Sequence, residues 1–184
     1  MKNPVARERI QGEGSLNEAR QQTGDGLDAE KWFREAVERH RDMVFRLAYT
    51  YLRDPADADD VTQDVFVKLL RSGKRFEGDD HLRYWLVRVT INECKSLFRK
   101  PWRRVEDIEA YAETLQAPSE QHRDLLVRVM RLPEKYRVPM VLHYYIGLST
   151  DEVARAIKVP AATVRTRLAR GRARLKSMLE GEKR

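Results

Sequence analysis

A cluster of arginines near the C-terminus carries the clearest chemical signal in the sequence. From Arg155 to Arg184, ten Lys and Arg residues stand against two acids, so this segment carries a net charge of +8 and the rest of the chain −1, for a total of +7. Arginine presents a planar fork of donors that matches phosphate oxygens and the edge of guanine. Such a segment favours a polyanionic ligand, although its charge alone would fit a solvated helix equally well.

Two helices joined by a tight turn would position these arginines. Ser149 and Glu152 can form a capping box that starts the first helix, and a turn over 158–160 leads into the second helix, over 161–179. This pattern predicts a helix-turn-helix whose second helix enters the major groove of DNA. A helical hairpin inside an ordinary bundle is the plainer alternative. The apolar residues expected to face the core are Val164, Leu168, Leu175 and Met178. The residues expected to contact DNA are Arg165, Thr166, Arg167, Arg170, Arg172 and Arg174.

Apolar residues recur at helical spacing along most of the chain, and no segment shows the alternation of a strand. The predicted fold is therefore all-α. Pro139 should kink the helix that contains it, because it removes one backbone hydrogen bond. The predicted helices cover 28–52, 56–70, 80–100, 119–132, 133–147, 149–157 and 161–179.

Composition divides the chain into two small helical domains joined by a flexible linker, the second domain containing the helix-turn-helix. Residues 1–27 are rich in Gly, Gln, Glu and Arg without a period, so we expect them to be disordered. Residues 105–118 are acidic and weakly patterned, which predicts the linker between domains over 28–104 and 119–180. Fully extended, this linker would span about 46–50 Å. That exceeds one turn of DNA, about 34 Å, so the two domains could bind separate sites on one duplex.

The C-terminal domain resembles a known family. Residues 132–175, LPEKYRVPMVLHYYIGLSTDEVARAIKVPAATVRTRLARGRARL, are similar to the promoter-binding region of sigma-70 factors, and most of all to the extracytoplasmic-function (ECF) group. The resemblance implies that the helix-turn-helix recognises the −35 promoter element, with Arg165, Thr166 and Arg170 at the reading positions. Ala162 stands where many members carry glycine, but alanine favours a helix start at least as well.

A segment in the first half resembles the polymerase-binding region of the same family. In residues 44–70, VFRLAYTYLRDPADADDVTQDVFVKLL, three residues match the pattern D-x-x-Q-x-x-F that binds the polymerase clamp helices. Its cluster of aspartates would repel DNA and attract a basic protein, although a solvated helix face is the plainer interpretation. The predicted polymerase contacts are Asp57, Asp60, Gln63, Asp64 and Phe66.

Residues 74–104 resemble the region that melts and recognises the −10 element. The segment from His81 to Arg104 contains seven Lys and Arg residues and one acidic residue. Binding of single-stranded DNA needs such a basic track together with planar groups on which unstacked bases stack. Asn92 matches the family's base-contacting asparagine, whereas Trp85 is expected in the core. The predicted contacts are Phe76, His81, Tyr84, Arg88, Asn92, Lys95 and Arg99.

The resemblance also implies the partners of the chain. These are core RNA polymerase, through its β′ clamp helices and β flap, promoter DNA, and an anti-sigma factor, with no small-molecule substrate. We expect a cytoplasmic protein, because no apolar run approaches a membrane span and residues 1–26 lack the apolar stretch of a signal peptide.

An enzyme is the first alternative, and the sequence does not favour it. It has no phosphate-binding loop, zinc-ligand spacing or nucleophile elbow, so we predict no catalytic residue, metal or cofactor. The single cysteine, Cys94, is expected to be a buried, inert thiol. A repressor is the second alternative. It would bind duplex DNA as a dimer without polymerase, but the chain offers neither a heptad seam for dimerisation nor the β/α pattern of a receiver domain.

Overall fold

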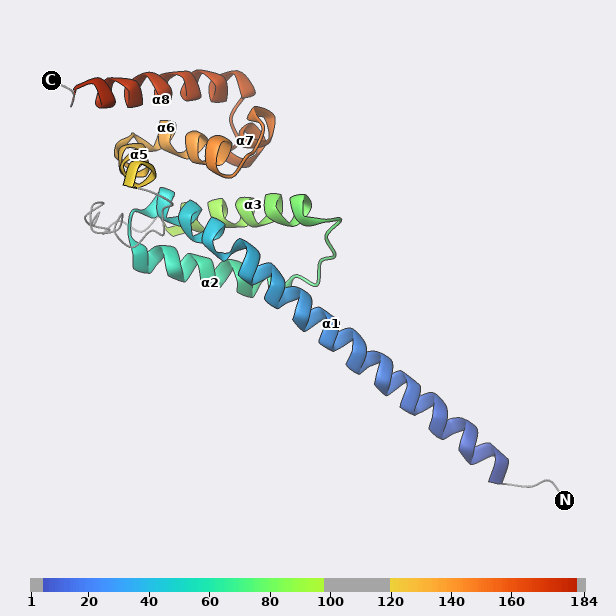
Figure 1. The fold of residues 1–184 in the computed structure, drawn as a ribbon. Helices are drawn as coiled ribbons and strands as arrows, with labels where there is room; N and C mark the ends of the chain where they lie inside the picture. The colour runs from blue at the N-terminus through green and yellow to red at the C-terminus, as the bar shows by residue number, and fades with distance from the viewer. Residues whose placement is uncertain (1–4, 98–119, 182–184) are drawn as a thin grey trace. The chain divides into compact units, whose positions relative to one another are not determined.

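Every regular element in the part of the chain that the structure describes is a helix, with no strand there (Figure 1). The computed structural model describes the backbone of residues 5–97 and 120–181, and the side chains of 28–97 and 125–180. Residues 1–40 and 41–184 form two separate units. The first unit consists of the beginning of α1 (Val5–Leu52), and the second holds the end of α1 and every other helix named below. The predicted all-α class is confirmed.

The N-terminal extension differs from the disorder predicted for residues 1–27, because α1 begins at Val5. The segment contains four glycines, yet most of the residues between them are Arg, Glu, Gln, Ala and Leu. These residues have high helix propensity, so a helical backbone does not require the apolar periodicity whose absence suggested disorder.

The end of α1 packs with α2 (Pro55–Arg71) and α3 (Asp79–Leu97) around an apolar core. The Asp54 carboxylate caps α2 by accepting a hydrogen bond from the Asp57 amide at 2.8 Å, and Pro55 takes the first helical position. Cys94 is buried in this region, as predicted. The core residues with no exposed surface include Val44, Leu47, Val61, Val65, Leu86 and Ile91.

Residues 120–181, the second stretch that the structure describes, form four α-helices and a short π-helix. These are α5 (Glu120–Arg131), α6 (Glu134–Met140), η1 (Val141–Tyr145), α7 (Thr150–Ile157) and α8 (Ala161–Gly181). Pro133 precedes the first turn of α6 as its N-cap, one position earlier than predicted. The backbone changes to the π-helix two residues after Pro139, and the Ile146 amide donates to the Val141 carbonyl at 3.0 Å. The expected interruption of this helix therefore takes the form of a wider turn.

The buried Arg137 guanidinium joins the ends of two helices in the second unit. It donates to the carbonyls of Thr50 in α1 at 2.7 Å and of Leu132, just after α5, at 2.8 Å. Carbonyls at a helix C-terminus have no partner within the helix, so Arg137 satisfies groups that burial would otherwise leave unpaired. Burial, reinforced by the nearby charge of Arg53, lowers the pKa of Arg137 to about 10.

Within the described residues, no helix combines the length and the apolar character that crossing a membrane requires.

Candidate nucleic-acid interface

The helix-turn-helix has the local geometry that the sequence predicts. The Ser149 hydroxyl accepts from the Glu152 amide at 3.2 Å, and the Glu152 carboxylate accepts from the Ser149 amide at 2.8 Å. The bonds with Ser149 lower the pKa of Glu152. At the other end of α7, Lys158 turns the chain with a left-handed backbone, φ 59°. The capping box and the turn together fix how α8 leaves α7.

One side of α8 is buried and the rest is open to solvent. Val164, Leu168 and Leu175 are buried as predicted, while Met178 is half-buried. Gly171 lies on the buried side, where an added Cβ would meet the Met140 sulfur at 2.6 Å. The absence of a side chain at this position lets α8 cross α6 closely. Among the predicted DNA contacts, the exposed residues are Arg165, Thr166, Arg170, Arg172 and Arg174, and Arg167 is half-buried.

Two tyrosines outside α8 hold several of its arginines in place. The Arg172 guanidinium donates to the Tyr144 hydroxyl at 2.6 Å. The Arg174 guanidinium lies 5.2 Å from the centre of the Tyr136 ring, a cation–π distance. Residues in α6 and η1 therefore shape the basic surface of α8, and nothing in the pattern of α8 itself indicates them.

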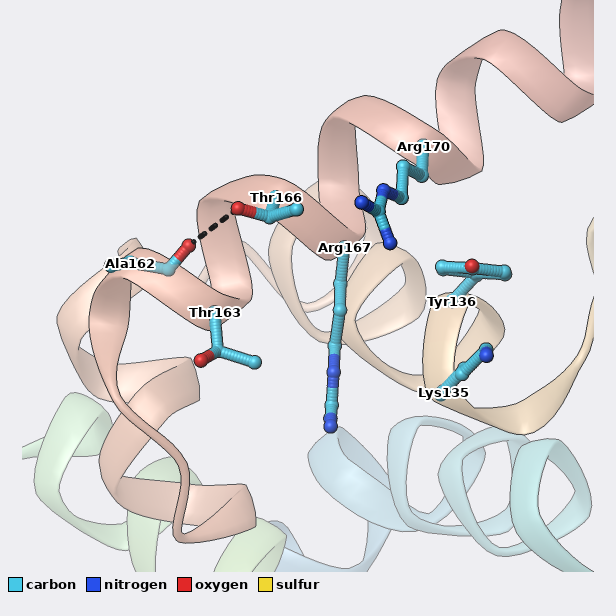
Figure 2. Close-up of a pocket in the computed structure, with 7 residues that line it drawn as sticks. All are labelled: Lys135, Tyr136, Ala162, Thr163, Thr166, Arg167 and Arg170. Atoms are coloured by element: carbon cyan, nitrogen blue, oxygen red, sulfur yellow. Dashed lines mark hydrogen bonds between the residues drawn. The ribbon is translucent and has the colours of Figure 1, made fainter.

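A pocket of about 310 Å³ opens between α6 and the first half of α8 (Figure 2). In Figure 2 the Arg170 guanidinium faces Tyr136, and the Thr166 hydroxyl turns back to the Ala162 carbonyl, to which it donates at 3.0 Å. Burial alone would raise the pKa of the Tyr136 hydroxyl, but Lys135, Arg170 and Arg174 together lower it. The field in this pocket is therefore positive. The lining residues are Lys135, Tyr136, Ala162, Thr163, Thr166, Arg167 and Arg170.

The predicted −10 surface combines an aromatic cluster with an exposed polar helix face. The Phe76 ring lies edge-on to His81 and Trp85, with ring centres 5.4 and 5.6 Å apart, and the Lys74 ammonium lies over Trp85 at 5.7 Å. Trp85 was expected in the core. It is half-buried instead, and it belongs to this aromatic cluster. The Tyr84 hydroxyl is buried and lacks a hydrogen-bond partner among the described residues. His81, Arg88, Asn92 and Lys95 are exposed, Phe76 and Tyr84 are half-buried, and Arg99 lies outside the described residues.

The predicted polymerase-binding face of α2 holds most, but not all, of the expected residues. Asp60, Gln63 and Asp64 are exposed, and Asp57 is half-buried beside the cap. Phe66 is only 6% exposed and packs in the core, so the expectation that it contacts polymerase directly is not supported by its position.

The large exposed apolar residues of α2 are Val67 and Leu70, which the motif did not indicate. The acidic face is also less uniform than the sequence suggests, because Arg41 of α1 pairs with Asp59 at 2.8 Å. The exposed surface of α2 is therefore acidic with an apolar edge.

Two family models match separate parts of the chain. Residues 36–104 match the family Sigma-70 region 2, and residues 122–175 match Sigma-70, region 4. The ECF RNA polymerase sigma factor SigE of Mycolicibacterium smegmatis is 32% identical over 168 residues, which cover 85% of this chain and 65% of that protein. The ECF RNA polymerase sigma-E factor of Escherichia coli K12 is 32% identical over 171 residues, covering 83% of this chain and 87% of that protein.

Two solved structures share the fold. RpoE from Bartonella quintana, solved with the anti-sigma factor NepR, has a TM-score of 0.62 at 19% identity and covers 82% of this chain and 98% of its own. CnrH, solved with the cytosolic domain of CnrY, has a TM-score of 0.59 at 28% identity and covers 83% of this chain and 90% of its own.

The chain belongs to the sigma-70 family of RNA polymerase sigma factors, and within that family to the ECF group. Factors of this family direct the initiation of transcription by RNA polymerase at specific promoters.

Proposed function

We propose that α8 recognises the −35 element of the promoter and that the loop over 74–80 together with α3 binds the melted −10 strand. This proposal is carried by one observation, the exposed basic face of α8. The capped helix α7 and a tight turn precede α8 in the chain. In a helix-turn-helix this face enters the major groove, where arginine reads guanine. The contacts proposed for the −35 element are Arg165, Thr166, Arg167, Arg170, Arg172 and Arg174. Those proposed for the −10 strand are Phe76, His81, Tyr84, Arg88, Asn92, Lys95 and Arg99.

The acidic face of α2 is the proposed binding site for the β′ clamp helices of core RNA polymerase. Asp60, Gln63 and Asp64 supply polar groups, and their negative charge complements a basic partner. Val67 and Leu70 extend the site with apolar area, whereas Phe66 supports it from the core. The β flap of polymerase is proposed as a second contact, made by the C-terminal domain.

An anti-sigma factor is a proposed partner, since RpoE from Bartonella quintana was solved in complex with the anti-sigma factor NepR. The proposal gives the chain no catalytic activity of its own, because the polymerase carries out RNA synthesis. It places the chain in the cytoplasm, where core polymerase acts.

Binding of a promoter duplex with and without core polymerase tests the proposal. The duplex is obtained by selection from random DNA with the reconstituted holoenzyme, and binding is followed by fluorescence anisotropy. We expect tight, sequence-specific binding only when core polymerase is present. Tight binding by a dimer of the chain alone would instead favour a repressor.

The two DNA sites are separated by a second measurement on the same complex. Asn92→Ala should reduce the permanganate reactivity of melted −10 thymines while leaving protection of the −35 duplex unchanged. Equal loss of both signals would contradict the assignment of α3 to the −10 strand.

A further inference from the structure

The first half of α3 is in contact with the helix-turn-helix. α7 packs against α3. The Arg83 guanidinium of α3 donates to the carbonyl of Ile146, the residue just after η1, at 3.3 Å. Its Nη1 also lies 3.9 Å from the point where a Cβ of Gly147 would stand. The C-terminal helices therefore cover part of the helix that is proposed to bind the −10 strand.

Arg83 also acts electrostatically on the capping box that begins α7. The hydrogen bonds with Ser149 are the largest causes that lower the pKa of Glu152, and the charges of Arg155 and Arg83 add to them. The first turn of α7 thus lies within the field of a side chain from α3. The contact between the two helices is electrostatic as well as steric.

Polar groups on this part of α3 are buried without full pairing. The Arg83 Nε and the Tyr84 hydroxyl are both buried and have no hydrogen-bond partner among the described residues. Tyr84 is one of the residues proposed to contact the −10 strand, so its hydroxyl is closed off in this arrangement. A buried polar atom without a partner is unfavourable, and its exposure to water offsets part of the packing lost on opening. This contact is therefore suited to be broken and remade.

Further polar contacts hold the C-terminal helices to the end of α1. The buried Arg137 guanidinium donates to the Thr50 carbonyl at 2.7 Å, and the Tyr145 hydroxyl donates to the Asp42 carboxylate at 2.9 Å. Asp42 and Thr50 lie in the region 2 match, whereas Arg137 and Tyr145 lie in the region 4 match. The two regions thus form one closed body in the second unit, although the sequence predicts separate domains on a flexible linker.

The proposed polymerase-binding face remains open in this closed body. Asp60, Gln63 and Asp64 are exposed on α2. Core polymerase can therefore reach the closed chain, whereas a single strand of DNA cannot reach the Tyr84 hydroxyl.

We propose that the free chain is autoinhibited: the contact of Arg83 with Ile146, together with the bonds of Arg137 and Tyr145 to α1, holds the helix-turn-helix over the first half of α3 and blocks the −10 strand until core polymerase binds. This inference rests on the proposed function of α3. Core polymerase favours the open form because it is proposed to contact the two regions at separate places, the β′ clamp helices and the β flap.

Binding of a single strand to the free chain tests the proposal. The probe is a labelled oligonucleotide with the non-template strand of the −10 element from the selected promoter, followed by fluorescence anisotropy. If Arg83 were only part of a basic surface, Arg83→Ala would weaken binding. We expect the opposite, tighter binding on the order of tenfold, which corresponds to a wild-type chain with about one molecule in ten open. Unchanged or weaker binding by Arg83→Ala would overturn the proposal.

Arg88→Ala is the matched control. It removes the same charge from an exposed arginine of the same helix that is itself a proposed −10 contact, so it should weaken strand binding. In the holoenzyme, where the chain is open, Arg83→Ala should bind the strand no more tightly than wild type. An equal gain with and without core polymerase would show that Arg83 opposes DNA directly, and autoinhibition would be wrong.

Tyr145→Phe opens the same contact from a surface residue whose substitution leaves the core intact. Tyr145 is 48% exposed, and the substitution removes only the hydroxyl that donates to Asp42. We expect tighter strand binding by the free chain here too, at a smaller gain than with Arg83→Ala. A gain for neither variant would overturn the proposal.

The distance between two spin labels reports the closed form independently of DNA. The labels are placed by Ser96→Cys on α3 and Ser177→Cys on α8, both exposed, while the native Cys94 is buried and protected from labelling. We expect one short distance in the free chain, a longer one with core polymerase, and a mixture of both in free Arg83→Ala. A single distance that core polymerase leaves unchanged would overturn the proposal. Loss of strand binding by the wild-type holoenzyme would instead be a failure of the proposed function, and the label distances would still show whether the chain closes.

Discussion

At the scale of single residues, the arginines of α8 differ in what restrains them. Arg172 donates to Tyr144, and Arg170 and Arg174 lie against Tyr136. A side chain that is already held loses less freedom when it binds, so these contacts favour a preformed surface. The sequence identifies the arginines by their number and spacing, but it cannot indicate the two tyrosines, because they come close to α8 only through the crossing of α6 and η1 with it.

Arg165→Ala and Arg170→Ala should each weaken promoter binding in a sequence-specific way, because both arginines are exposed and stand at the reading positions that the family resemblance implies. Loss of a two-bond contact with guanine costs about 1–3 kcal/mol and relaxes specificity at one base pair. We expect this result for both substitutions, each at its own base pair. Affinities of the holoenzyme for single-base variants of the −35 element provide the measurement. A loss of affinity that is equal for every base variant would contradict base recognition by the substituted arginine.

At the scale of helices, the family motif and the helical spacing of apolar residues in α2 predict different positions for Phe66. The helical period places Phe66 among Val61, Val65 and Leu69, and the structure buries all four. The D-x-x-Q-x-x-F resemblance instead gives Phe66 a contact with polymerase, which its burial does not support. The period also places Leu70 on the same apolar side, yet Leu70 is 63% exposed because it lies in the last turn of α2, at the edge of that side.

Phe66→Ala and Leu70→Ala should consequently affect different properties. Removing a buried phenylalanine costs about 3–5 kcal/mol of unfolding free energy. We expect such destabilisation for Phe66→Ala, and for Leu70→Ala only weaker binding to core polymerase. Urea unfolding and titration of core polymerase separate the two effects. The proposed role of Leu70 would be wrong if its substitution left polymerase affinity unchanged.

The first helix of the helix-turn-helix shows how far local sequence determines structure. Ser149 and Glu152 predict the capping box, and the structure contains both of its hydrogen bonds. The π-helix after Pro139 is different, because a proline indicates an interruption without specifying how the neighbouring backbone accommodates it.

Ser149→Ala should lower the unfolding free energy by about 1 kcal/mol, since it leaves the Glu152 amide without its capping partner. Ser177→Ala, on the exposed side of α8, is the control and should change stability little. Denaturant unfolding of the two variants measures the difference. Equal stabilities would show that the cap contributes nothing measurable.

At the scale of the second unit, polar contacts join the end of α1 to the C-terminal helices. Arg137 donates to the Thr50 carbonyl, and the Tyr145 hydroxyl donates to the Asp42 carboxylate at 2.9 Å. Burial, followed by the hydrogen bond to Asp42, raises the pKa of Tyr145 to about 12. No sequence pattern pairs residues about a hundred positions apart, so these contacts could not be predicted.

The raised pKa of Tyr145 makes stability depend on pH in the alkaline range. Between about pH 10, where an unfolded tyrosine loses its proton, and pH 12, the folded state retains a proton that the unfolded state has released. The contribution of Tyr145 is therefore complete below pH 10 and is lost as the pH rises to 12. Tyr145→Phe should lose less unfolding free energy between pH 8 and 11 than wild type. Burial also raises the pKa of Tyr51, which both proteins retain, so their difference isolates Tyr145. An identical loss in both proteins would contradict the prediction.

The most direct test of the account is run-off transcription with purified core RNA polymerase on the selected promoter, with and without the chain. We predict a specific transcript only when the chain is present, its loss with Arg165→Ala or Asn92→Ala, and its retention with Ser177→Ala. Absence of specific initiation, together with tight binding of the same duplex by a dimer of the chain alone, would contradict the central claim that this chain acts as a promoter-recognising sigma factor.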